Sequence, residues 1–455
     1  MTIAPGIFRQ YDIRGVVGDD LTEEAARALG GAYAALLRER GVTGEVAVGR
    51  DNRPSGKALR DALVQGLTES GVNVVDIGVV PTPLLYWSLH HLAVAGGIQI
   101  TGSHNPPEYN GFKLCLGTES LHGHDIQHLL ALIRSNAAPT GAGRVRQEQV
   151  IDRYVADVAQ RIGTLSRPLR IVYDCGNGAG ALVAPQLMSA IGVQGAGLFC
   201  ESDGTFPNHH PDPTVPANLQ DLIAAVKRDG AELGVAFDGD ADRIGLVDGD
   251  GRIIWGDHIL ILYARDVLER TGRGQPVIFD VKCSQALPHE IEKAGGRPVM
   301  WKTGHSLIKD KMKELKAPLA GEMSGHMFFG EGFYGHDDAL YGAARLLRIV
   351  ADSGRSVREL LADVPEFVST PEIRVDCGDD RKFDVVAKAV DHFRRSHDVS
   401  DVDGVRVLFG DGWGLIRASN TQPILVLRFE ARSEQRLGEI RGELEGWLRG
   451  QGVTV

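Results

Sequence analysis

Short apolar runs that end at an aspartate occur three times along the chain. Each run is followed by small or polar residues, a helix-like stretch, a strand that opens with glycine, and a final apolar strand that leads directly into a polar loop. This order is typical of βαβ units. The pattern therefore predicts three domains that repeat in architecture and not in residue identity. The runs are residues 45–51, 169–174 and 276–280, and the final strand-to-loop segments read GGIQITGSHN, ELGVAFDGDADR and APLAGEMSGH.

The last part of the chain has a different pattern. Beyond residue 370, short apolar strands follow one another and an amphipathic helix over residues 433–448 closes the chain, which predicts a smaller α+β domain with antiparallel strands. The expected fold class is α/β, with three similar α/β domains whose sheets are mixed and mostly parallel, plus this α+β C-terminal domain. Lapses in the pattern place the domains at residues 1–147, 148–251, 252–364 and 365–455.

The polar loops are expected to meet. Because βαβ crossovers are right-handed, the loops that follow parallel strands collect at one edge of each sheet, and open α/β sheets bind ligands at that edge. Three such domains are expected to turn three loops toward one cleft. The Asp-Gly-Asp-Gly sequence at residues 248–251 lies between two apolar runs and is predicted to be a hairpin.

Composition excludes several classes of function. A formal net charge of -11 argues against nucleic acid as a partner, since phosphate backbones are bound mainly by lysine and arginine. No apolar run has the roughly 20 residues of a membrane span and no secretion signal opens the chain, so we expect a cytoplasmic protein that does not bind membranes. The five cysteines are scattered and odd in number, which favours reduced thiols, and no chemistry is assigned to them.

The loop at residues 101–113, TGSHNPPEYNGFK, carries a hydroxyl, an imidazole and an ammonium group. Its proline pair and its Asn-Gly sequence predict a rigid turn. Ser103 is a candidate nucleophile that needs activation. Adjacent residues of an extended loop face opposite ways, so His104 is expected to be a poor base for it, and Lys113 is favoured instead. Alternatively, Ser103 and His104 brace a turn and Lys113 is a solvated surface lysine.

Three aspartates at alternate positions give the sharpest signal in the sequence. In an extended loop, Asp238, Asp240 and Asp242 would point the same way and repel one another unless a cation lay among them. Oxygen ligands of this kind suit Mg²⁺. The spacing resembles the start of a calcium-binding EF-hand loop, but a strand follows where that loop needs a glutamate and a helix. A solvated acidic turn is the alternative.

Two further loops carry groups that suit a phosphorylated sugar. Residues 321–326, GEMSGH, offer a carboxylate, a hydroxyl and an imidazole, which match sugar hydroxyls, although a simple turn is almost as good an interpretation. Residues 417–423, RASNTQP, combine an arginine with hydroxyl, amide and backbone N–H donors, which together make a phosphate cradle or, taken alone, a capped turn.

The four loops occur together, in this order, with one in each predicted domain. In this combination the chain resembles the α-D-phosphohexomutase superfamily over essentially its whole length. Within it, the segments FRQYDIRG at 8–15, FPNHHPDP at 206–213 and WKTGHSLIK at 301–309 are most similar to the bacterial phosphomannomutase/phosphoglucomutase group. The resemblance implies a heart-shaped, four-domain enzyme with a central cleft that interconverts hexose 1-phosphate and hexose 6-phosphate.

The resemblance also implies roles for individual residues. Ser103 would carry a phosphoryl group and bind Mg²⁺ together with Asp238, Asp240 and Asp242, and Arg243 would lie near the phosphoserine. Lys113 and His305 would transfer protons. Glu322 and Ser324 would hold the 3- and 4-hydroxyls of the sugar, with His326 and Lys282 beside them. The phosphate that is not reacting would be held by Tyr11, Arg14, Arg417, Ser419, Asn420 and Thr421.

The partners implied are small-molecule hexose phosphates of glucose or mannose, with glucose 1,6-bisphosphate or its mannose equivalent as activator and intermediate. A monomer or weak dimer is expected. Phosphoglucosamine mutase, a Mg²⁺-dependent sugar phosphatase and a non-catalytic sugar-phosphate-binding protein are the alternatives. One departure concerns the metal loop, where the family usually has a second glycine and this chain has Ala241. If that position has φ > 0, alanine adds about 1–2 kcal/mol of strain. Gln422 also replaces a more usual Thr or Glu.

Overall fold

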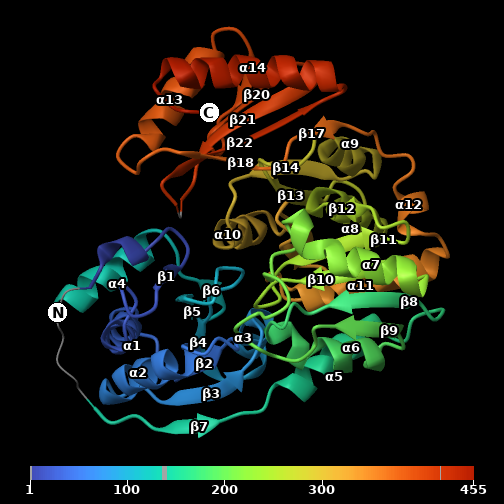
Figure 1. The fold of residues 1–455 in the computed structure, drawn as a ribbon. Coiled ribbons are helices and arrows are strands. Elements are labelled where there is room, and N and C mark those ends of the chain that lie inside the picture. The colour runs from blue at the N-terminus through green and yellow to red at the C-terminus, as the bar shows by residue number, and fades with distance from the viewer. Residues whose placement is uncertain (1–2, 136–140, 421) are drawn as a thin grey trace.

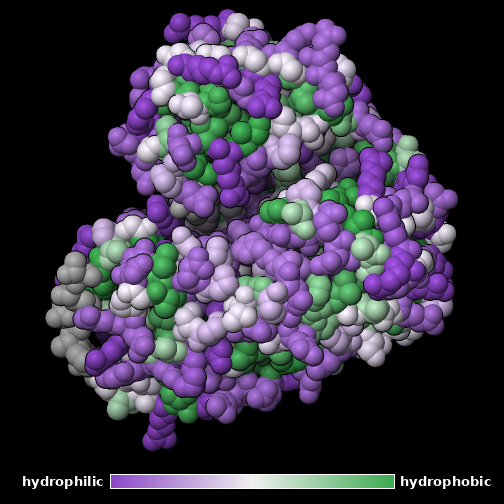
Figure 2. Space-filling model, in the orientation of Figure 1, coloured by the Kyte–Doolittle hydropathy of each residue, from purple (hydrophilic) through white to green (hydrophobic). Residues whose placement is uncertain are grey.

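The computed structural model describes residues 3–135, 141–420 and 422–455. Four sheets, one per domain, surround a central hollow, and Figure 1 shows the last domain above it with the first three below and to the right. The space-filling view shows the same hollow between the upper lobe and the lower left lobe (Figure 2). The predicted four-domain α/β architecture is confirmed. Residues 136–140, near the predicted end of the first domain, lie outside the described residues.

The first domain is built on a sheet in the order β1-β5-β4-β2-β3-β7, with β6 paired to β5. Strands β2, β3 and β4 are parallel, and β5 returns antiparallel to β4. Thr22 caps the first helix by accepting a hydrogen bond from the backbone N–H of Ala25. The elements are β1 (Ile13–Val16), α1 (Glu23–Glu39), β2 (Glu45–Arg50), α2 (Gly56–Glu69), β3 (Val74–Val79), α3 (Thr82–His91), β4 (Val94–Ile100), β5 (Tyr109–Leu116), β6 (Glu119–Ser120), α4 (His124–Ser135) and β7 (Val145–Gln147).

The second domain repeats this arrangement in the order β12-β11-β10-β8-β9. Its parallel strands are β8, β9 and β10, and β11 returns antiparallel to β10. The predicted hairpin at residues 248–251 is confirmed, since β11 and β12 pair antiparallel across it. The elements are α5 (Ile151–Ile162), β8 (Arg170–Asp174), α6 (Ala184–Ala190), β9 (Gln194–Leu198), α7 (Gln220–Asp229), β10 (Leu233–Phe237), β11 (Ile244–Asp248) and β12 (Ile253–Ile254).

The third domain repeats it again, in the order β14-β13-β15-β16, with only β16 antiparallel. Its last long helix, α11, leaves this sheet and packs against α5 and β10 of the second domain. One apolar core therefore runs through both domains. The elements are α8 (Gly256–Thr271), β13 (Pro276–Asp280), α9 (Ala286–Lys293), β14 (Arg297–Trp301), α10 (His305–Leu315), β15 (Leu319–Gly321), β16 (Met327–Phe329), α11 (Ala339–Ser353) and α12 (Val357–Leu360).

The fourth domain is an antiparallel sheet in the order β17-β22-β21-β20-β19, with β18 also paired to β22. Two helices cover one face of it, as Figure 1 shows at the top of the molecule. Among the described residues, no helix is long and apolar enough to cross a membrane. The elements are β17 (Val368–Ser369), β18 (Ile373–Asp376), α13 (Lys382–Phe393), β19 (Asp398–Ser400), β20 (Val405–Leu408), β21 (Gly412–Ala418), β22 (Ile424–Ala431) and α14 (Glu434–Gly450).

All four candidate loops connect antiparallel neighbours. The loop with Ser103 joins β4 to β5, the aspartate loop joins β10 to β11, the loop with Glu322 joins β15 to β16, and the loop with Asn420 joins β21 to β22. In the first three domains the strand before the loop is parallel to the rest of the sheet, so its carboxyl end lies at the ligand-binding edge. The common topology is what places the four loops around one site.

Candidate active site

Ser103 connects the first domain to the second. Its backbone is in the left-handed region, with φ of 49°, and its side chain is buried. The backbone N–H donates to Thr101 Oγ1 at 2.8 Å, and the hydroxyl donates to Asp238 Oδ2 at 2.9 Å. A left-handed conformation outside glycine is uncommon and is found where surrounding contacts enforce it. The candidate nucleophile is therefore held against the aspartate loop.

His104 lies closer to Ser103 than the sequence predicts. Its Nδ1 is 3.2 Å from Ser103 Oγ. The expectation that the two side chains face opposite ways is wrong, because it assumes an extended loop and the positive φ of Ser103 turns the chain. Burial, followed by the positive charge of Arg243, lowers the pKa of His104 well below its ordinary value. The ring is therefore neutral at neutral pH.

Arg53, which sequence reasoning missed, anchors the Ser103 loop. Its side chain is fully buried and forms an ion pair with Asp51. Its guanidinium group donates to four backbone carbonyls of the loop, so one residue fixes the turn from inside. Those acceptors are Ser103 O at 2.7 Å, Asn105 O at 2.5 Å, Pro106 O at 2.5 Å and Tyr109 O at 3.1 Å.

Replacing Arg53 with lysine is expected to lower the free energy of unfolding by about 3 kcal/mol. A lysine has one ammonium group, which cannot reach four carbonyls and a carboxylate spread over a planar fork, and the buried acceptors left unpaired are destabilising. Urea denaturation followed by tryptophan fluorescence measures the loss. The matched control is Arg27→Lys, at an exposed ion pair with Glu69, for which less than about 1 kcal/mol is expected. Equal effects of the two changes would contradict the anchoring role.

The three aspartates of the second loop converge, as predicted. One carboxylate oxygen from each of Asp238, Asp240 and Asp242 lies within 4.8 Å of the others, and all three residues are fully buried. The solvated-turn interpretation is therefore wrong. The loop is not extended, however, since Ala241 has φ of 57° and its N–H donates to the Asp238 carbonyl at 3.0 Å. A tight turn brings the carboxylates together, with Asp238 Oδ1 accepting from two backbone N–H groups of its own loop.

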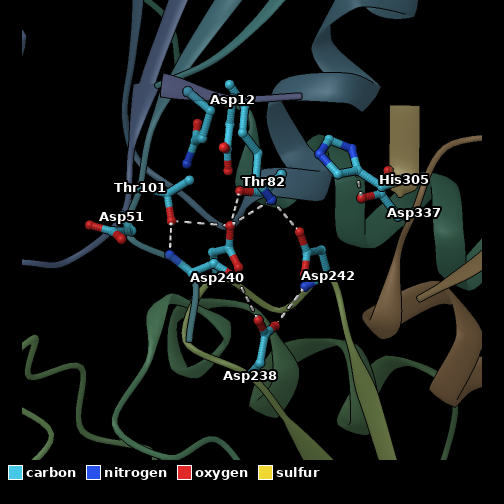
Figure 3. Close-up of polar contacts among 12 residues, drawn as sticks. Asp12, Asp51, Thr82, Thr101, Asp238, Asp240, Asp242, His305 and Asp337 are labelled. Atoms are coloured by element: carbon cyan, nitrogen blue, oxygen red, sulfur yellow. Dashed lines mark hydrogen bonds and ion pairs between the residues drawn. The ribbon is translucent and has the colours of Figure 1, made fainter. Parts of the chain in front are cut away.

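Domain I closes over this cluster. Figure 3 shows Asp240 at its centre, contacted by Thr82 and Thr101. The backbone N–H of Thr82, at the first residue of α3, donates to the Asp240 carbonyl at 3.0 Å. Lys113 Nζ lies 3.2 Å from Asp240 Oδ2 and also contacts Asp242 Oδ2. Lys113 is buried, so the surface-lysine alternative is wrong.

The pKa values of Asp238 and Asp242 are shifted in opposite directions. Burial, followed by the charges of Asp242 and Asp240, raises the pKa of Asp238 well above its usual value. Burial also opposes ionisation of Asp242, but Lys113 and then His326 outweigh it and hold the pKa of Asp242 well below the usual value. Asp240 Oδ1 is buried and accepts no hydrogen bond, whereas Asp242 Oδ1 is contacted by His326 Nε2 at 3.2 Å. An unpaired buried carboxylate oxygen is unfavourable, and a cation among the three aspartates would satisfy it.

Replacing Ala241 with glycine is expected to change the free energy of unfolding by less than about 1 kcal/mol. Relief of left-handed strain contributes about 1–2 kcal/mol. It is offset by about 0.8 kcal/mol for the lost buried methyl group and by about 0.4–1 kcal/mol for the freer unfolded chain. The control is Ala236→Gly on β10, where the buried alanine has no positive φ and only the losses remain. Urea denaturation without metal compares the two, and equal losses would contradict strain at Ala241.

The third-domain loop is joined directly to the aspartate loop. His326 bridges them, with Nδ1 2.8 Å from Glu322 Oε2 and Nε2 3.2 Å from Asp242 Oδ1. The Gly304 N–H donates to Glu322 Oε1 at 2.7 Å, and Ser324 Oγ lies 3.0 Å from His326 Nδ1. Burial opposes protonation of His326, but Asp242 outweighs it and raises its pKa to about 9. This loop is an ordered part of the site and not a simple turn.

Two predicted residues of the third domain have acidic partners that sequence reasoning missed. His305, the first residue of α10, has Nδ1 3.8 Å from Asp337 Oδ2. Burial, followed by the charge of Lys309, lowers the pKa of His305 well below its ordinary value. Lys282 Nζ lies 3.2 Å from Glu372 Oε2, at the entry to the fourth domain.

The fourth-domain loop meets Tyr11 of the first domain. Asn420 Nδ2 donates to the Tyr11 hydroxyl at 3.3 Å, and the Tyr11 ring lies edge-on to His305, with centroids 6.0 Å apart. Arg417 is held by Asp403 through Nε at 3.0 Å and Nη2 at 2.9 Å.

The other predicted phosphate ligands are Ser419, Arg14 and Thr421. Ser419 Oγ accepts from the Gln422 N–H at 3.1 Å. The contacts of Arg14 are to Asp12 at 2.6 Å and to Asn105 at 3.3 Å, at the Ser103 loop and not at the loop of Asn420. Thr421 lies outside the described residues.

Four domain families match the chain in order. They are phosphoglucomutase/phosphomannomutase alpha/beta/alpha domain I at residues 5–138, domain II at 152–251, domain III at 255–367 and the C-terminal domain at 372–446. The chain belongs to the phosphoglucomutase/phosphomannomutase family. Each family domain contains most strands of one of the four sheets, so all four parts of the family's organisation are present here.

Similar proteins support the same assignment over nearly the full length. A phosphomannomutase/phosphoglucomutase of Pseudomonas putida is 49% identical over 440 residues, which cover 96% of this chain and 94% of that protein. A phosphoglucomutase of Neisseria meningitidis is 46% identical over 450 residues, with 97% and 96% covered. The crystal structure of a phosphoglucomutase/phosphomannomutase family protein from Burkholderia thailandensis has a TM-score of 0.91 and 44% identity, covering 99% of this chain and 98% of that one. The family resemblance inferred from the motifs is confirmed.

Proposed function

We propose that the chain interconverts hexose 1-phosphate and hexose 6-phosphate, with glucose or mannose as the sugar, through a phosphoserine at residue 103 and a 1,6-bisphosphate intermediate. The observation that carries the proposal is the contact of Ser103 Oγ with Asp238, one of three buried carboxylates that converge on one point. A hydroxyl at a carboxylate cluster suits phosphoryl transfer, in which positioning and charge neutralisation supply most of the catalysis.

The aspartate loop is the proposed Mg²⁺ site. Asp238, Asp240 and Asp242 are hard oxygen donors, and Asp240 Oδ1 is buried without a partner, which fits a divalent cation. With the phosphorylated Ser103 they would hold the ion, which would neutralise negative charge on the phosphoryl group. Arg243, whose Nε lies 3.3 Å from His326 Nε2, places a second positive charge between the aspartate loop and the sugar loop.

The proposed reaction has two phosphoryl transfers at one site. In the first, the Ser103 Oγ–P bond breaks and a bond forms between phosphorus and the free hydroxyl oxygen of the sugar monophosphate. The hydroxyl proton passes to a base. The serine oxygen takes up a proton from a second proton carrier, and the Ser103 hydroxyl that results is the acceptor in the second transfer. The bisphosphate then turns end for end and returns its other phosphoryl group to Ser103. His305 suits the role of base because its lowered pKa keeps the ring neutral. Lys113 is proposed as the second proton carrier.

The remaining predicted residues are proposed to bind substrate. Glu322 and Ser324, with His326 and Lys282, would hold the sugar hydroxyls in both orientations. The distal phosphate would be held from two domains, since Tyr11 and Asn420 are in contact across the hollow. Arg14, Arg417, Ser419 and Thr421 would complete that set. The domain limits at 147, 251 and 364, a cytoplasmic location and a monomer or weak dimer stay predictions.

Turnover of glucose 1-phosphate, mannose 1-phosphate and glucosamine 1-phosphate in parallel tests the proposal. With Mg²⁺ and glucose 1,6-bisphosphate present, glucose or mannose 6-phosphate is expected to form without equivalent free phosphate. Release of phosphate faster than the 6-phosphate appears would instead identify a phosphatase. A clear preference for the glucosamine substrate would identify the aminosugar mutase.

A further inference from the structure

Two cysteines that are distant in the sequence face each other behind the aspartate loop. Cys175 follows β8 and Cys200 follows β9, two parallel neighbours paired through Asp174 and Leu198. Their Sγ atoms are 3.0 Å apart. The S–S bond of a disulfide is about 2.0 Å long, so the two Sγ atoms need to approach by about 1 Å to form one. The Cα spacing that a disulfide requires is also typical of residues on neighbouring strands. The spacing of Cys175 and Cys200 in the sequence does not indicate that they are in contact.

Cys200 is the reactive member of the pair. All five cysteines lie within the described residues, and Cys200 alone is partly exposed while the others are buried. A hydrogen bond from the Cys175 thiol lowers the pKa of Cys200, and the same bond, followed by burial, raises the pKa of Cys175. The thiolate is the nucleophilic form, so an oxidant reaches and attacks Cys200 first.

The segment that follows Cys175 supports both catalytic loops. The Ala179 N–H donates to the Gly239 carbonyl at 2.9 Å, inside the aspartate loop. The Asn177 carbonyl accepts from Asn52 Nδ2 at 2.7 Å, and Asn52 directly precedes Arg53, which holds the Ser103 loop. Asn177 Nδ2 donates to the Glu201 carbonyl at 2.9 Å, so the Cys200 segment is attached to the same assembly. Hydrogen bonds therefore connect the Cys175 and Cys200 segments to the backbone around the aspartates.

We propose that Cys175 and Cys200 form a reversible oxidation site, in which a hydroperoxide converts the two thiols to a disulfide and displaces the aspartate loop. The Cys200 thiolate attacks the peroxide oxygen and becomes a sulfenic acid, and the leaving oxygen takes up a proton. The Cys175 sulfur then bonds to the Cys200 sulfur, and the S–O bond breaks to release water. Overall, two thiols give two electrons and two protons to the peroxide, which leaves as water when the oxidant is hydrogen peroxide. A small-molecule dithiol reverses the step by exchange.

Peptide mapping of the full chain tests the site independently of any activity. After treatment with hydrogen peroxide, free thiols are alkylated and the chain is digested without reduction. A Cys175–Cys200 linked peptide is expected in the wild type and in Cys377→Ser, and none in Cys200→Ser or Cys175→Ala. Cys200→Ser is the substitution that disturbs the local structure least, because a serine hydroxyl can still donate to the Leu198 carbonyl as the thiol does. Oxidation of Cys200 to sulfinic acid without a linked peptide would overturn the site.

Turnover measured on the same samples tests the coupling to the aspartate loop. Misplacement of reacting groups on the order of 1 Å can lower a rate on the order of 10²-fold, so disulfide formation is expected to lower kcat by about tenfold or more. Dithiothreitol is expected to restore kcat, and Cys200→Ser to retain it under peroxide. If wild type and Cys200→Ser lose kcat at the same rate, the coupling is overturned. An untreated chain without mutase turnover would contradict the proposed function, and the linked peptide would still decide the site.

Discussion

Replacing Ser103 with alanine is expected to lower conversion of glucose 1-phosphate by about 10⁴-fold or more, even with glucose 1,6-bisphosphate present. The variant has no oxygen to carry the phosphoryl group, and loss of a covalent nucleophile removes about this much catalysis or more. The coupled assay for glucose 6-phosphate measures it. Turnover near the wild-type rate would exclude the phosphoserine.

Ser103→Gly separates the hydroxyl from the backbone conformation. Ser103 has φ of 49°, which glycine adopts without strain and alanine does not. If the hydroxyl is what matters, both variants are equally inactive, and circular dichroism shows both to be folded. Activity in Ser103→Gly but not in Ser103→Ala would mean that the loop conformation, and not phosphoryl transfer, accounts for the loss.

The double change of Asp238 and Asp240 to asparagine is expected to lower kcat on the order of 10³-fold and to abolish stabilisation by Mg²⁺. Neutral amides keep the shape of the loop but remove two of the three carboxylates that would hold a divalent cation. In the wild type, Mg²⁺ at a hundred times its Kd adds about 2.7 kcal/mol to the free energy of unfolding. Thermal unfolding with and without Mg²⁺ measures this difference.

The matched control for the aspartate loop is Asp250→Asn. Asp250 lies in the β11–β12 hairpin, and its side chain is 64% exposed and paired with Arg358. Its replacement is expected to leave kcat and the Mg²⁺ effect unchanged. If the double variant still gains stability from Mg²⁺ at the wild-type concentration, the ion binds elsewhere and the triad has another role.

The repeated pattern of apolar runs predicted the strands, their grouping into three α/β domains and the four loops at the site. It did so because buried strands and their polar loops differ sharply in composition, and because right-handed crossovers leave few topologies. The apolar pattern predicts the positions of strands better than it predicts whether neighbouring strands are parallel or antiparallel. The antiparallel return strands β5 and β16 read much like parallel ones, so the hairpin-like form of each loop emerged only in the structure.

The sequence did not predict the local backbone conformation of the loops or the partners that are distant along the chain. The positive φ values of Ser103 and Ala241 reversed the expected direction of His104 and replaced an extended aspartate loop with a turn. Arg53 is one of many arginines in the chain, and nothing near it in the sequence indicates that its acceptors lie about fifty residues later. Glu372, the partner of Lys282, is likewise set by the packing of the third domain against the entry to the fourth.

Transfer of a labelled phosphoryl group in a single turnover tests the central claim most directly. The chain, labelled by glucose 1,6-bisphosphate carrying radioactive phosphate, is mixed with excess unlabelled glucose 1-phosphate and quenched at short times. The account predicts one label per chain, located on Ser103 by peptide mapping, and its passage to glucose bisphosphate at a rate no slower than kcat. Label on another residue, or release from Ser103 as free phosphate, would contradict it.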